Sequence, residues 1–164
     1  MDESAFTEWA VGAQRQLLRV AVLLTGDLHV AEDLVQEALA KVAVRWNRLA
    51  AGNPTGYART VIVRDNVSRW RVRRGREVST ATQSDLAAVS SDPETAMVVR
   101  QALARLTHKQ RAVVVLRHFE DLSVAEVAAV MRVGIGTVKS QNAAGLARLR
   151  DGAPELLELI GRSR

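Results

Sequence analysis

The stretch LSVAEVAAVMRVGIGTVKSQNAAGLARLR, residues 122–150, decides the fold and is typical of a helix-turn-helix. A short helix is predicted to begin after Ser123, because Glu126 three residues later completes a capping-box pattern. The break that follows contains Gly134, which tolerates the positive φ that a tight turn can need. A second helix is predicted over 135–150, and small polar and cationic residues occupy the end that enters the major groove in such motifs. The pattern favours a DNA-binding protein.

Helix pairs joined by a glycine turn also occur in bundles that bind no nucleic acid. An αα-hairpin whose Val and Leu stripe only fills a core is therefore the alternative at this point. The chain has 164 residues and a formal net charge of +5, which favours a polyanionic partner. A basic protein without such a partner would have the same net charge. The distribution of the charge along the chain therefore has to distinguish the two interpretations.

Composition excludes several classes of site. The chain has no cysteine, which removes disulfides, thiolate zinc sites and cysteine nucleophiles. Its three histidines lack metal-ligand spacing, and no glycine-rich phosphate loop or nucleophile motif is present. We therefore predict no catalytic residue, no metal site and no cofactor. The sequence shows no run of about 18 apolar residues and no secretory signal, so a cytoplasmic protein without a membrane span is expected.

Helical periodicity and the absence of strand alternation predict an all-α fold. A segment rich in Ser, Thr, Asp and Gln over 77–92 predicts a flexible linker between two small helical domains, 1–76 and 93–164. Leucines in the tail 153–164 predict a last packing helix. The other predicted helices cover 5–24, 29–46, 54–74, 95–106 and 109–119.

Positive charge is concentrated on the third helix. Residues 57–76 hold seven arginines and one acid, Asp65, so their net charge of +6 exceeds the +5 of the whole chain. Such a concentration is expected of a surface that follows phosphates. Tyr57 and Trp70 lie among these arginines, where aromatic rings can stack on unpaired bases. Burial of both rings as core anchors of the helix is at least as plausible an interpretation.

The second helix carries an acidic and amide face formed by Glu32, Asp33, Gln36 and Glu37. This face lies beside an apolar stripe, and a solvated helix surface would have the same composition. The functional interpretation is a docking surface for a basic partner helix.

Five stretches in this order resemble a bacterial RNA polymerase sigma factor of the extracytoplasmic-function (ECF) type, of the short actinobacterial subgroup. The resemblance covers roughly residues 5–150. The five stretches are residues 31–38, 68–71, 110–117, 119–123 and 136–140.

The resemblance implies a role for each part of the chain. Domain 1–76, similar to sigma region 2, would bind core polymerase and recognise and melt the −10 element. Domain 93–164, similar to region 4, would read the −35 element. The implied residues for core polymerase are Asp33, Gln36 and Glu37. Those for −10 DNA are Asn53, Tyr57, Arg64, Arg69, Trp70, Arg71, Arg73 and Arg74. Those for −35 DNA are Gly136, Thr137, Lys139, Ser140 and Asn142.

The implied partners are core RNA polymerase (its β′ clamp helices and β flap), promoter DNA as duplex and melted strand, and an anti-sigma factor. Relatives often have Asn at Arg64, a basic residue at Thr60, Arg at Ala144 and Gln141, and a Ser cap at Gly134. Two rival hypotheses are a stand-alone helix-turn-helix transcriptional regulator and a helical interaction protein without a nucleic-acid role.

Overall fold

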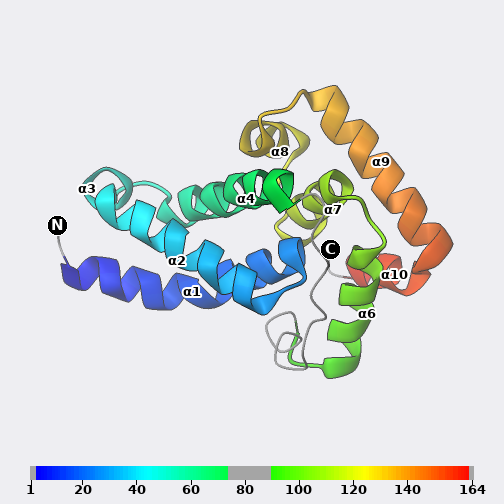
Figure 1. Cartoon of the computed structure of the whole chain (residues 1–164), viewed down its shortest axis with the longest axis horizontal. Coiled ribbons are helices and arrows are strands. Elements are labelled where there is room, and N and C mark those ends of the chain that lie inside the picture. Colours follow the sequence, from blue (N-terminus) through cyan, green and yellow to red (C-terminus); the bar gives the residue numbers. More distant parts are fainter. Residues whose placement is uncertain (1–2, 74–89, 163–164) are drawn as a thin grey trace. The chain divides into compact units, whose positions relative to one another are not determined.

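The computed structural model describes residues 3–73 and 90–162, and its chain divides into two compact units, Met1–Ala88 and Val89–Arg164. Within the described residues every regular element is a helix, so the predicted all-α fold is confirmed (Figure 1). Most of the predicted linker, 77–92, lies outside the described residues. Its last residues precede α6 (Pro93–Ala104), where Asp92 caps the helix by accepting a hydrogen bond from the Thr95 amide at 3.0 Å.

The first unit is built from three long helices that pack on one another. They are α1 (Glu3–Thr25), α2 (Leu28–Val44) and α4 (Pro54–Arg73), with the single turn α3 (Trp46–Leu49) before α4. Each long helix contributes apolar side chains to one core, which removes their surface from water. The largest fully buried ones are Leu17, Val20, Leu23, Leu34, Val35, Val42, Ile62 and Val63.

A glycine, a capping side chain and a break in helical geometry set the ends of α1 and α2. Gly26 follows α1 with φ 69°, a conformation that glycine adopts without steric cost, and Asp27 then caps α2 through the Val30 amide at 3.1 Å. The second helix was expected to run through Trp46, and it ends at Val44 instead. Arg45 leaves helical geometry with ψ 9°, and the new turn places Trp46 in the core.

Three aromatic rings hold the start of α1 against this turn. The ring centroids of Phe6, Trp9 and Trp46 lie 5.4–5.8 Å apart, within the range of favourable tilted and edge-on pairs. Trp9 Nε1 also donates to Thr55 Oγ1 at 3.0 Å. These contacts tie the start of α1 to the first residue of α3 and to the first turn of α4.

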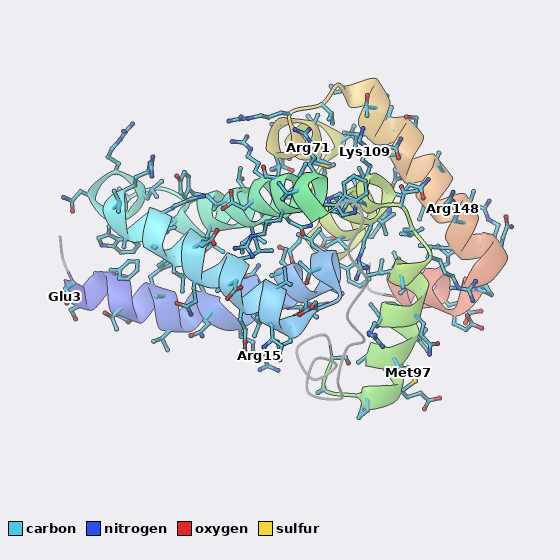
Figure 2. The ribbon with its side chains drawn as sticks, in the orientation of Figure 1. Glu3, Arg15, Arg71, Met97, Lys109 and Arg148 are labelled. Atoms are coloured by element: carbon cyan, nitrogen blue, oxygen red, sulfur yellow. The ribbon has the colours of Figure 1, made fainter. Side chains whose placement is uncertain are left out.

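The second unit is organised around α9 (Ile135–Gly152). This helix packs on α7 (His108–Val114), α8 (Val124–Met131) and α10 (Pro154–Arg162), and α10 also contacts α6. The predicted tail helix is confirmed, with Leu156 fully buried. The helix expected over 109–119 ends in a wider π-helical turn, η1 (Val115–Phe119). Arg148, labelled in Figure 2, donates from α9 to the carbonyl of Arg105 just after α6.

The helix-turn-helix is confirmed in outline and corrected in one detail. Ser123 and Glu126 form the predicted capping box, and a second box, Thr107 with Gln110, caps α7. The residue with positive φ in the turn is Arg132, at 55°, whereas Gly134 has an extended conformation and precedes α9 without a side-chain cap. The Val133 amide donates a hydrogen bond to the Ala128 carbonyl and so closes the end of α8. This closure places the preceding residue, Arg132, in the left-handed conformation.

Gly145→Ala should destabilise the second unit, although alanine favours helices. A Cβ there would lie 2.9 Å from Cγ2 of the buried Val114, so α7 and α9 would have to move apart. We expect a net loss of about 1 kcal/mol in the free energy of unfolding, measured by urea denaturation. Gly12→Ala is the matched control, because a Cβ at this exposed position of α1 meets nothing within 4 Å. It should gain about 0.5–1 kcal/mol. Equal effects of both changes would contradict the close approach of α7 and α9.

Candidate docking and nucleic-acid surfaces

The acidic and amide face of α2 points away from the core. Asp33, Gln36 and Glu37 are exposed, whereas Leu34 and Ala38 on the other face are fully buried. The side chain of Asp33 is 71% exposed and that of Glu37 is 50% exposed. The structure therefore brings the three residues implied for polymerase docking together on one solvent-facing surface, which we call the acidic face.

Arg69 of α4 reaches across to this acidic face. Its guanidinium hydrogen-bonds Glu37 Oε1 and lies 3.9 Å from Asp33 Oδ2. Sequence reasoning placed Arg69 with the −10 DNA residues and missed this contact. The two partners are separated by 32 residues, and only the packing of α2 against α4 brings them together.

A second ion pair ties the same two helices. Lys41 Nζ of α2 lies 2.6 Å from Asp65 Oδ2 of α4, and the Asp65 side chain is only 24% exposed. Asp65 is the one acid in the arginine-rich stretch 57–76. Its charge is therefore matched inside the unit, and the arginines of this stretch keep their collective excess of positive charge.

The loop before α4 contributes Asn53 and Tyr57. Asn53 Oδ1 accepts from the Gly56 amide at 2.7 Å, so its side chain caps α4, and Gly56 leaves the room that this contact requires. Tyr57 is half-buried, and the guanidinium carbon of Arg45 lies 5.9 Å from its ring centroid. Residues 45–64 contain no acid, so this corner is cationic. Sequence reasoning did not single out Arg45.

The last turns of α4 present a mixed aromatic and cationic surface. Trp70 is 41% exposed, so it is not the core anchor that the alternative interpretation required. Arg71 is exposed and is labelled near this end of α4 in Figure 2. Arg64 is half-buried. Arg73 ends the helix, and Arg74 lies outside the described residues.

The start of α9 presents four of the five residues implied for −35 DNA. They are exposed, while Val138 between them is fully buried and anchors the helix. The fifth, Asn142, is half-buried and its Oδ1 accepts a hydrogen bond from His118 Nε2 at 3.0 Å. Asn142 is thus engaged with η1. The exposed four are Gly136, Thr137, Lys139 and Ser140.

The second unit also contains a half-buried histidine, His108, at the start of α7. Burial lowers the pKa of His108 to about 4, and the positive charge of Arg111 adds to the effect. Burial likewise lowers the pKa of Arg111 to about 10, which still leaves it cationic at neutral pH. His108 is therefore neutral at neutral pH, consistent with a structural place at the start of α7.

Within residues 3–73 and 90–162, no group of three or more His, Asp or Glu side chains could hold a metal ion. In the same part of the chain, no helix combines the length and apolarity that crossing a membrane requires.

Comparison with known proteins decides between the hypotheses. Residues 11–76 match Sigma-70 region 2, and residues 102–151 match Sigma-70, region 4. The chain is 38% identical over 149 residues to the RNA polymerase sigma-E factor of Streptomyces avermitilis, covering 89% of this chain and 83% of that protein. The chain belongs to the ECF sigma factors. The predicted resemblance is confirmed, and the comparisons give no support to a stand-alone regulator.

Two further proteins are similar to this sigma factor, one in sequence and one in fold. The ECF RNA polymerase sigma factor SigM of Mycobacterium tuberculosis is 34% identical over 153 residues, covering 90% of this chain and 76% of that protein. The sigma factor RpoE of Bartonella quintana, solved in complex with the anti-sigma factor NepR, superposes with a TM-score of 0.65. It covers 89% of this chain and 94% of its own at 21% identity, so this likeness concerns the fold alone.

The stability of this sigma factor should fall as the pH drops from about 7 to about 5. Below its ordinary pKa of 6.5, His108 takes up a proton in the unfolded chain, whereas in the folded chain its pKa of about 4 keeps it neutral. The unfolded state then binds more protons, and the loss is complete only below pH 4. Between pH 7 and 5 we expect the free energy of unfolding of His108→Gln to fall by about 1 kcal/mol less than that of the original chain, allowing for solvent screening of the partly exposed ring; urea denaturation measures both. Parallel pH profiles would contradict this assignment.

Proposed function

We propose that the first unit binds core RNA polymerase and the −10 element, and that the second unit binds the −35 element. The domain limits are those expected from the sequence, 1–76 and 93–164. The protein would act in the cytoplasm and hydrolyse nothing, so binding and strand capture supply the energy for melting. The observation that carries the proposal is the joint presence, on one unit, of the exposed acidic face and the arginine-rich α4.

The acidic face fits a basic partner helix. Asp33 and Glu37 are one helical turn apart, and Gln36 lies beside them, so a partner helix can contact all three at once. Their exposure leaves carboxylate and amide oxygens open to cationic donors. In the polymerase core, the family resemblance assigns this partner to the β′ clamp helices, and assigns the β flap to the second unit.

The α4 surface fits a melted strand. Arginines track phosphates without regard to sequence, and the exposed ring of Trp70 offers a stacking surface for an unpaired base. Tyr57 with Arg45 over its ring supplies a second aromatic and cationic position at the other end of the helix. This arrangement supports capture of single-stranded −10 DNA by the first unit.

The start of α9 fits the major groove. Thr137, Lys139 and Ser140 are exposed there, whereas buried Val138 fixes the rotation of the helix. In helix-turn-helix proteins this end of the second helix meets the base edges. Ala144 stands where relatives often have Arg, so this chain offers fewer cationic contacts to the duplex. The anti-sigma partner of the Bartonella relative adds an anti-sigma factor to the partner classes to be tested.

Run-off transcription tests the whole proposal. Purified chain and core RNA polymerase are incubated with genomic DNA, and the start sites are mapped. Initiation at specific sites that core alone does not use supports the proposal. A folded chain that leaves core without specific starts would overturn it.

Asp33→Ala combined with Gln36→Ala should weaken binding to core polymerase about tenfold, since contacts at the centre of an interface carry most of its affinity. Helix content should not change, because both side chains are exposed. Fluorescence-detected titration with core measures the affinity. Glu8→Ala removes one negative charge from an exposed position of α1, outside the acidic face; it is the control and should have a smaller effect. Unchanged affinity of the double variant would exclude the acidic face as the docking surface.

Lys139→Ala should lower affinity for −35 duplex DNA and reduce the slope of log affinity against log salt by about 1, because one phosphate contact is lost. Fluorescence anisotropy at several salt concentrations measures both quantities. Lys109→Ala removes the same charge from an exposed position of α7 and serves as the control. If both variants behave alike, the start of α9 does not face DNA.

A further inference from the structure

Arg69 belongs to the helix proposed to bind nucleic acid, α4, and contacts the acidic face proposed to bind core polymerase. Its guanidinium pairs with Glu37 and Asp33 of the acidic face. The Arg69 side chain is 27% exposed, compared with 71% for Asp33 and 50% for Glu37. Arg69 is therefore more buried than the two carboxylates that it approaches. Arg69 therefore sits within the acidic face, as a part of its surface.

We propose that Arg69 is an internal counter-ion of the acidic face, which competes with the cations of a docking partner and so weakens docking. The inference rests on the proposed function, since it concerns the basic partner helix assigned to this face. It assigns Arg69 to protein docking and removes it from the −10 DNA set.

Charge arithmetic at the face supports the competition. Asp33 and Glu37 carry two negative charges, and Arg69 cancels one of them within ion-pair distance. A partner cation therefore meets a local charge of −1, and would meet −2 without Arg69. Arg69 also occupies Glu37 Oε1, one of the oxygens that an incoming arginine would need for a bidentate contact.

The direction of Arg69 separates it from the cations that serve nucleic acid. Successive helical residues differ by about 100°, so Arg71 lies about 200° round α4 from Arg69. Arg71 is exposed, whereas the charge of Arg69 is compensated by two carboxylates. A phosphate bound by Arg69 would have to displace both carboxylates, so the Arg71 side of α4 is better suited to a nucleic-acid backbone.

Arg69→Gln tests the proposal on the full chain with core RNA polymerase. Because partly exposed ion pairs are weak, we expect docking affinity to rise about two- to fivefold at ~0.1 M salt. The gain should shrink at ~0.5 M salt, where screening shortens the range of charge interactions. Arg69→Lys keeps the cation and should stay close to the original affinity. Equal or lower affinity of Arg69→Gln at low salt would overturn the proposal.

Three controls separate competition from a structural role or a general charge effect. Arg15→Gln makes the same change in net charge at an exposed position of α1, and should give a smaller rise than Arg69→Gln. Introduced into Glu37→Gln, the Arg69→Gln change should lose most of its gain, because the paired carboxylate is gone. Thermal unfolding of Arg69→Gln shows whether the variant remains folded. If it does not, Arg69→Met, which keeps an apolar stem without the charge, repeats the test.

Binding to forked −10 DNA gives a second readout. Arg69→Gln should leave this affinity within about twofold, whereas Arg71→Gln should lower it, because loss of a phosphate contact weakens binding uniformly. A larger loss for Arg69→Gln than for Arg71→Gln would overturn the reassignment. Failure of the original chain to bind core would instead refute the proposed function, so the two failures are distinguishable.

Discussion

The burial of one face of α2 is the constraint on which the first unit depends. Leu34, Val35, Ala38 and Val42 are inaccessible because α1 and α4 pack over them. Their position fixes the rotation of α2, and the acids that alternate with them must then face solvent. The same packing brings α4 close enough for Lys41 and Asp65, and for Glu37 and Arg69, to pair. The burial of one face of α2 thus determines both the exposure of the acidic face and its pairing with Arg69.

In the second unit, too, the buried face of one helix determines which of its residues are exposed. Val138, Gly145 and Leu149 of α9 are buried, and the absence of a side chain at Gly145 lets α7 approach closely. The exposed start of α9 thus belongs to a helix held by buried contacts along its length, which suits a surface that must match the regular geometry of a duplex.

Local patterns were predictable from the sequence, and long-range contacts were not. The helices, the Ser123 and Glu126 capping box and the family could be identified because each signal lies within a few residues. The Thr107 and Gln110 box had the same kind of signal and was overlooked. The break at Arg45 and the pairing of Arg69 with Glu37 accompany tertiary packing, which no local pattern records. The left-handed residue of the turn is Arg132 and was missed because glycine is the residue expected at positive φ. The roles of the candidate site residues remain predictions.

The placement of the tryptophans has an optical consequence. The chain has three, and two of them, Trp9 and Trp46, share the aromatic cluster at the base of α4. The third, Trp70, is 41% exposed and lies near the far end of the same helix. Indole emission depends on the polarity around the ring, so the two sites contribute separate components to the intrinsic fluorescence. The chain thus carries, without chemical labelling, one spectroscopic probe of its folding and another of the surface proposed to meet the melted strand.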